Sequence, residues 1–188
     1  MTRYKLPELW EDYVDANDPR LFKELNRLVS LNRLTYEDAL NYAATEGRLA
    51  AAISLMEHGV AATTMSLTLA AYNGQLEMMH LLLAHGANVN EVVPLSWVAR
   101  TPLMVAVGCA NVEAVRILMD AGAQLDAVNE DGHTALAFVY ASVHREITSL
   151  LIESGMDVKG KQLTELLARP LTEVHPDILE MLRRAGCQ

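Results

Sequence analysis

The pattern of apolar and polar residues over positions 65–90 predicts two short helices joined by a tight turn. The first covers 65–72, and Asn73-Gly74 breaks it because glycine accepts the left-handed conformation of a helix end. The second covers 76–84, and His85-Gly86 ends it in the same way. Its apolar residues recur at helical spacing on one face; they are Leu76, Met79, Leu82 and Leu83.

This helix pair recurs along the chain. A Leu-Met-x-x-Gly or similar ending closes each copy, and the marker glycines are Gly59, Gly86, Gly122, Gly155 and Gly186. The first two of these glycines are the closest together, and the second and third are the farthest apart. The separations lie near a period of roughly 33 residues, a length found among known helical repeats. A pair this short cannot bury its own apolar face, so the sequence predicts that the copies stack into a helical repeat array.

Two further motifs connect this period with a known family. Residues 101–106 read TPLMVA and residues 129–136 read NEDGHTAL. With the stretch LAAYNG at 69–74, they make the chain resemble the ankyrin repeat family over roughly residues 35–188. Some positions depart from the family pattern: Ser66 and Ala135 replace proline, Thr68 and Met104 replace histidine, and Val143 stands at the usual inter-helix glycine.

The resemblance implies an all-α fold, an ankyrin-repeat helical solenoid with short β-turn fingers and terminal capping helices. We expect an N-terminal helical cap over 1–34 and the array over 35–188. The expected repeats one to five cover 35–60, 61–90, 91–126, 127–158 and 159–188. The close spacing of Gly59 and Gly86 leaves only Val60–Thr64 between repeats one and two. That link is too short for a finger, so we predict a missing or stunted one.

Local signals place several helix ends. Asp18-Pro19 predicts the start of a capping helix whose apolar residues are Leu21, Leu25 and Leu28. Thr35 and Asp38 resemble a capping box that opens repeat one, and Thr101-Pro102 opens repeat three. In repeat four, Thr134 is expected to cap a helix in which Phe138 and Tyr140 replace small residues and widen or tilt the repeat. Repeat five is expected to contain a helix near 163–167 and a last helix starting at His175-Pro176.

The predicted finger over 90–100 is unusually apolar. It carries Val92, Val93, Leu95, Trp97 and Val98. Large apolar side chains left in water mark an interface, and tryptophan is enriched at binding hot spots. Two interpretations remain open: either these side chains meet a partner, or the finger folds back and Trp97 packs on its neighbour.

The charge of the chain limits its partners. The formal net charge is −9. Residues 34–158 hold 4 Lys and Arg against 14 Asp and Glu. Such a surface repels phosphate backbones, which argues against a nucleic acid partner. A protein with a basic surface fits better, although acidic character also serves simply to keep soluble proteins apart.

The sequence offers no catalytic grouping. It lacks the common nucleophile, metalloprotease and phosphate-loop motifs. The two cysteines, Cys109 and Cys187, read as free thiols, and His80 and His85 have poor spacing for a metal. We therefore expect no cofactor, no metal and no enzyme activity. The absence of an apolar span or signal segment leads us to expect a cytoplasmic monomer with no membrane contact.

The resemblance implies a protein–protein interaction module that binds its partner through a concave surface of fingers and first helices. The alternative is a small inhibitor or immunity-type protein that covers the active site of an enzyme or toxin. The positions implied as partner-binding are Tyr72, Asn73, Glu91, Val93, Leu95, Trp97, Arg100, Cys109, Glu130, Asp131, His133 and Ser142.

Overall fold

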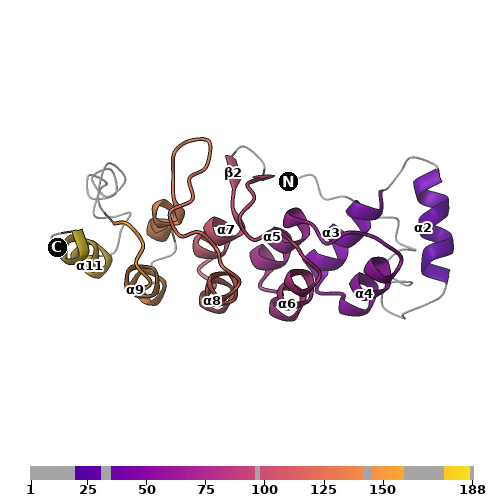
Figure 1. Cartoon of the computed structure of the whole chain (residues 1–188), viewed down its shortest axis with the longest axis horizontal. Helices are drawn as coiled ribbons and strands as arrows, with labels where there is room; N and C mark the ends of the chain where they lie inside the picture. The colour runs from indigo at the N-terminus through magenta and orange to yellow at the C-terminus, as the bar shows by residue number, and fades with distance from the viewer. Residues whose placement is uncertain (1–19, 31–34, 96–97, 142–144, 159–175, 187–188) are drawn as a thin grey trace. The chain divides into compact units, whose positions relative to one another are not determined.

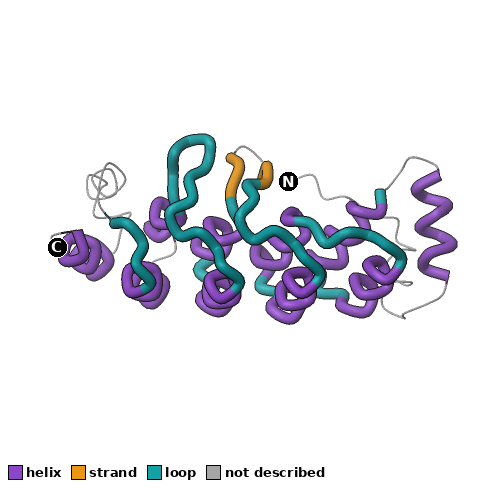
Figure 2. The backbone as a smooth tube through the Cα atoms, in the orientation of Figure 1, coloured by secondary structure: helices purple, strands orange, loops and turns teal. Residues whose placement is uncertain are grey.

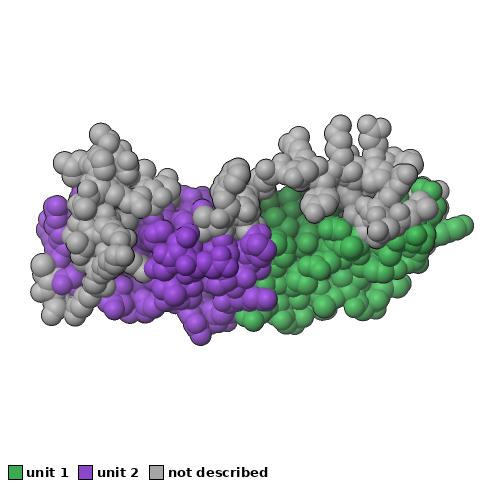
Figure 3. All heavy atoms as spheres, turned by 90° about the horizontal axis from the view of Figure 1, so that it is seen from above, with its two compact units in different colours: residues 1–88 green, residues 89–188 purple. Residues whose placement is uncertain are grey.

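A computed structural model describes residues 20–30, 35–95, 98–141, 145–158 and 176–186. It divides the chain into an N-terminal unit, 1–88, and a C-terminal unit, 89–188 (Figure 3). Some residues named in the sequence analysis lie outside the described part; they are Asp18, Pro19, Trp97, Ser142, Val143, the predicted helix near 163–167, His175 and Cys187.

The N-terminal unit is built from helices (Figure 1). Helices α3 and α4 form one antiparallel pair and α5 and α6 form the next; α3 packs on α5, and α4 packs on α6. Small residues allow this close approach, because Ala43, Ala44, Ala70 and Ala71 are all fully buried. The helices are α2 (Arg20–Ser30), α3 (Tyr36–Glu46), α4 (Leu49–Glu57), α5 (Thr64–Asn73) and α6 (Leu76–Ala84).

Both first helices of this unit begin at capping boxes. The Asp38 N–H donates to the Thr35 hydroxyl over 2.9 Å, and the Thr35 N–H donates to the Asp38 carboxylate over 2.9 Å. This confirms the predicted box. Thr63 and Ser66 form a second box, which the sequence analysis missed. The cap residue of α5, Thr63, lies two residues before Met65, the position that matches Thr101 in repeat three. Ser66 is a member of this box, which explains why serine replaces the family's proline there.

The early start of α5 changes the link between the first two repeats. Helix α4 ends at Glu57 and α5 begins at Thr64. The residues between them, 58–63, are all described, and none forms a strand. The predicted loss of this finger is therefore confirmed, and the chain passes directly from one helix pair to the next (Figure 2).

The C-terminal unit begins with a finger. Strands β1 (Val93–Leu95) and β2 (Val98–Arg100) pair antiparallel, with Val93 opposite Arg100. Helix α7 (Pro102–Gly108) follows, capped by Thr101 with proline at its start as predicted. It packs on α8 (Val112–Asp120), on β2 and on the short helix of repeat four.

Repeat four departs from the expected geometry. Its first helix, η1 (Ala135–Ala141), is a tighter 3-10 helix rather than an α-helix. Aromatic and β-branched residues such as Phe138 and Val139 have lower α-helical preference than the alanines found in the other first helices. Helix α9 (Arg145–Glu153) contacts η1 and α8, and α11 (Pro176–Gly186) contacts α9.

Matching side chains connect successive repeats within the C-terminal unit. The Gln124 N–H donates to the Asn90 side-chain oxygen over 2.8 Å, and the Asp157 N–H donates to the Asp126 carboxylate over 2.9 Å. Asn90 lies four residues after Gly86 and accepts from Gln124, which lies two residues after the next marker glycine, Gly122. Asp126 lies four residues after Gly122 and accepts from Asp157, which lies two residues after Gly155. The same hydrogen bond therefore recurs at the same register of the repeat.

The outer helices bury one face each. In α2, Leu25 and Leu28 are buried and Lys23 is exposed. In α11, Ile178, Leu179 and Leu182 are buried, while Arg183 and Arg184 are exposed in the last turn. These amphipathic helices fit the predicted capping role, in which a terminal repeat needs a polar outer face.

The inter-helix turns share one backbone geometry. The residue after each turn donates its N–H back into the first helix: Arg48 to Ala43, Gln75 to Ala70 and Asn111 to Ala106, over 2.9 to 3.1 Å. This geometry requires a left-handed residue. Gly47 and Gly74 supply it at φ 69° and 70°, but in repeat three Ala110 stands there at φ 60°.

The Ala110→Gly variant is expected to raise the free energy of unfolding by about 1 kcal/mol, because a left-handed conformation costs a residue with a Cβ about 1–2 kcal/mol. Urea denaturation followed by circular dichroism measures the change. The matched control is Gly74→Ala, which should destabilise the protein by a similar amount. A destabilised Ala110→Gly protein would contradict the assigned strain.

Candidate partner-binding surface

The first finger exposes an acidic side chain and a proline and buries a valine. Glu91 and Pro94 are exposed, whereas Val93 is only 6% exposed. Val93 therefore packs inside the C-terminal unit and adds nothing to its accessible apolar surface, although the sequence analysis placed it among the contact residues. Leu95 lies at the end of β1, and Trp97 lies outside the described residues.

The second finger, 128–133, is a turn organised by Asn129. This residue is 5% exposed, and its side-chain oxygen accepts the N–H groups of Asp131 and His133 over 3.1 and 2.9 Å. The Asn129 N–H also donates to the His133 carbonyl over 3.0 Å. The finger leaves Val128 54% exposed. Glu130 and Asp131 are also exposed, so apolar and acidic groups are presented on a fixed backbone.

The Phe138 ring of η1 meets one side chain from each finger. The Arg100 guanidinium carbon lies 4.6 Å from the centre of the Phe138 ring, a cation–π contact. His133 meets the same ring edge to face, at 6.4 Å between ring centres and 84° between planes. A Cβ placed on Gly108 would lie 3.8 Å from the Phe138 Cβ, so the base of the Phe138 side chain lies close to the end of α7.

Cys109 caps the end of α7 and is exposed. Partial burial of its side chain raises the pKa of its thiol above the ordinary value, and the positive charge of Arg100 opposes this by a smaller amount. The thiol is therefore mostly protonated at neutral pH, which does not suit a nucleophile or a metal ligand. Its surface position beside Arg100 places it on the candidate surface as a neutral polar group.

The structure thus brings together Arg100, Cys109 and His133, which the resemblance had implied, in one cluster. It adds Phe138, which the sequence analysis treated only as bulk. The sequence could have drawn attention to Phe138, because this large side chain replaces a small residue on a first helix. Its contact with Arg100, which belongs to the preceding repeat, depends on the packing of the finger against η1.

The N-terminal unit holds the two other implied residues. Tyr72 is 48% exposed at the end of α5, and Asn73 next to it is also exposed. The Asn73 side chain donates to the Leu69 carbonyl over 2.8 Å, which fixes it along its own helix. Both side chains are therefore exposed at the end of a first helix.

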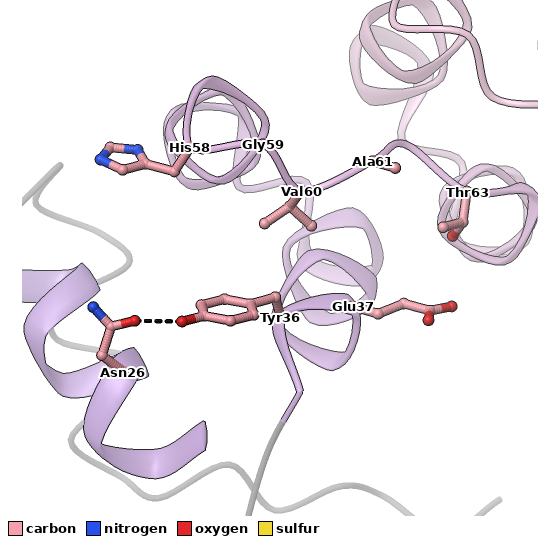
Figure 4. Close-up of a pocket in the computed structure, with 8 residues that line it drawn as sticks. All are labelled: Asn26, Tyr36, Glu37, His58, Gly59, Val60, Ala61 and Thr63. Carbon is pink, nitrogen blue, oxygen red and sulfur yellow. Dashed lines mark hydrogen bonds between the residues drawn. The ribbon is translucent and has the colours of Figure 1, made fainter. Parts of the chain in front are cut away.

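A hollow in the N-terminal unit was not predicted. It has a volume of about 560 Å³ and lies beside the link that lacks a finger (Figure 4). The Tyr36 hydroxyl donates to the side-chain oxygen of Asn26 across its floor. The close spacing of the first two marker glycines was the signal for it, because a finger of normal length has no room in this link. The lining residues are Asn26, Tyr36, Glu37, His58, Gly59, Val60, Ala61 and Thr63.

Neither unit presents an obvious reaction centre among its described residues. No three histidine, cysteine or carboxylate side chains gather there as a metal site would require. No helix within the same residues has the length and apolar content that crossing a membrane demands. The described surfaces present exposed aromatic and apolar groups, acidic side chains and one stacked arginine.

Paired helices, a β-hairpin finger and a repeat period of roughly 33 residues define a helical repeat protein. A family described as "Ankyrin repeats (3 copies)" matches residues 67–162, more than half of the chain. The chain belongs to the ankyrin repeat family, and its fold is the expected all-α ankyrin solenoid. Ankyrin repeats are generally protein–protein interaction modules.

Three curated relatives are similar to this chain. Ankyrin repeat and KH domain-containing protein mask-1 of Caenorhabditis elegans is 30% identical over 170 residues, which cover 83% of this chain and 6% of that protein. Ankyrin repeat and KH domain-containing protein 1 of Homo sapiens is 36% identical over 101 residues, which cover 52% of this chain and 4% of that protein. Ankyrin repeat and KH domain-containing protein mask of Drosophila melanogaster is 34% identical over 101 residues, which cover 52% of this chain and 2% of that protein. The chain thus spans less than a tenth of each relative.

Proposed function

We propose that the chain is a non-catalytic module that binds a protein partner through the two fingers and the α7 end of its C-terminal unit. The proposal rests mainly on the second finger, which combines a fixed backbone with an exposed apolar side chain. Asn129 fixes its backbone through two accepted hydrogen bonds, and Val128 stays 54% exposed. A preformed backbone lowers the entropy cost of association, because less of the chain must be ordered on binding.

The charges of the two fingers suggest how a partner approaches. Glu91, Glu130 and Asp131 are exposed and acidic, so they would attract a partner whose surrounding surface is basic. Contacts of this kind mainly raise the association rate and weaken with salt. Affinity would come from desolvated side chains near the centre, among which Trp97 is the strongest candidate by residue type.

Trp97→Ala and Val128→Asp test the proposed surface. Affinity capture with the tagged full chain from its host, read by quantitative mass spectrometry, identifies the partner, and calorimetry then measures its affinity. We expect Trp97→Ala to weaken binding by about 2 kcal/mol, roughly thirtyfold in Kd. Val128→Asp should also weaken binding, because it puts a charge into an apolar contact.

Ile53→Ala is the control for these variants. Ile53 is 40% exposed on α4, away from both fingers in the sequence and in a different unit. It should leave the affinity unchanged. If both finger variants bind as tightly as the wild type while remaining folded, the surface is wrongly assigned. If the captured partner is an enzyme and the chain abolishes its activity, the module acts as an inhibitor.

We place the module in the cytoplasm as a monomer, in keeping with its free surface thiol and acidic charge. Imaging of the tagged chain in host cells tests the location. Light scattering during size-exclusion chromatography tests the oligomeric state, and a mass of two or more chains would contradict it.

A further inference from the structure

Within the described part of the C-terminal unit, Arg100 differs from Arg116 and Arg145 in having no carboxylate partner. Arg116 pairs with Glu146 at 3.0 Å and Arg145 lies 3.8 Å from Asp177, so both are neutralised within the C-terminal unit. Among the described residues no carboxylate pairs with Arg100, even though the surrounding repeats are rich in Asp and Glu. Its guanidinium rests instead on the Phe138 ring.

The environment of Arg100 leaves a hydrogen-bond donor unused. Its Nε atom is buried and has no hydrogen-bond partner in the described structure. A buried donor left without an acceptor costs about 1–3 kcal/mol, and such orphans are rare in native proteins. The aromatic ring beneath the guanidinium orients its plane but accepts none of its N–H groups in the way that an oxygen would.

This arrangement suits an acidic group. A planar guanidinium backed by an aromatic ring keeps its N–H groups in a fixed fork, which matches the two oxygens of a carboxylate. Arg100 is partly buried, and the lower effective dielectric there strengthens the attraction relative to water. Building on the proposed function, we propose that Arg100, stacked on Phe138, binds a glutamate or aspartate side chain presented by the partner protein.

The surrounding charges favour a carboxylate over a phosphate group. Glu91 and the second finger's Glu130 and Asp131 are exposed and acidic. They repel a group that carries about two negative charges more strongly than one that carries a single charge. The partner segment would therefore place one acidic side chain at Arg100, with basic residues around it facing the acidic fingers.

Two matched peptides test this site in the full chain. Acetyl-Gly-Glu-Gly-amide is titrated against the ¹⁵N-labelled protein, and the Arg100 Nε–H signal is followed by NMR. We expect a saturable shift at millimolar peptide and no shift with acetyl-Gly-Gln-Gly-amide, which has the same shape without the charge. Arg116→Gln should leave the Arg100 response intact, because Arg116 is exposed and already paired with Glu146.

Cys109 supplies an independent readout, because Arg100 lies near enough for its charge to act on that thiol. Iodoacetate and iodoacetamide both alkylate a thiolate, which forms a C–S bond as iodide leaves, but only iodoacetate is an anion. The positive charge of Arg100 attracts iodoacetate, so the ratio of the rate with iodoacetate to the rate with iodoacetamide at Cys109 should fall about fivefold in Arg100→Gln. It should not change in Arg116→Gln. Added salt should lower the same ratio in the wild type, which tests the site without any substitution.

Each outcome decides the proposal. Equal NMR responses to the two peptides, or an alkylation ratio that depends on neither Arg100 nor salt, would overturn it. A strong response to inorganic phosphate with none to the glutamate peptide would also overturn it in favour of a phosphate site. If these tests fail while Trp97→Ala and Val128→Asp still weaken partner binding, the proposed function stands and only the carboxylate site is lost.

Discussion

Replacing Leu118 with alanine is expected to lower the free energy of unfolding by about 3 kcal/mol. Leu118 is fully buried in α8, the helix that contacts both α7 and α9. Its side chain therefore lies where successive helix pairs meet, and its removal leaves a cavity that the fixed helices cannot fill. The cost is the lost apolar burial plus the lost packing contacts around the cavity.

Urea denaturation followed by circular dichroism measures the effect of Leu118→Ala. The control is Ile53→Ala, which removes an aliphatic side chain that is 40% exposed in α4 and should cost less than about 1 kcal/mol. A cost for Leu118→Ala no larger than that of the control would mean that α8 is not packed between its neighbours as described.

Gly47→Ala is expected to destabilise the N-terminal unit by about 3 kcal/mol, for two separate reasons. Gly47 has φ 69°, where a Cβ costs about 1–2 kcal/mol. A Cβ there would also lie 2.3 Å from the side-chain oxygen of Gln75. Gln75 would have to move and lose the hydrogen bond it donates to the Thr45 carbonyl over 3.3 Å, which contributes about 1 kcal/mol.

The two causes can be separated by a double-mutant cycle. Gln75→Ala alone should cost about 1 kcal/mol. In the Gln75→Ala background, Gly47→Ala should cost only its conformational part, about 1–2 kcal/mol, because the clash is gone. Gly86→Ala is the matched control, since Gly86 has φ 87° and open space around the position of a Cβ. If the costs of Gly47→Ala and Gln75→Ala simply add, the predicted clash does not occur.

The features that the sequence predicted correctly depend on a few adjacent residues. Thr35 with Asp38 and Thr101 with Pro102 start helices because each cap satisfies N–H groups within one turn. The glycines at 74 and 86 end helices because glycine accepts a positive φ without strain. The missing finger followed from counting residues between two such glycines. The sequence analysis predicted α5 to begin at 65, one residue after its observed start, and so missed the Thr63–Ser66 box.

Tertiary structure decided which of the implied surface residues are exposed and which are buried. By itself, the sequence determined the repeat period, the family, most helix ends and the acidic character of the array, because these depend on local geometry and composition. Only the folded chain buried Val93, wound 135–141 into a 3-10 helix and placed Arg100 on Phe138. These outcomes depend on how a finger packs against helices tens of residues away, which no local pattern records.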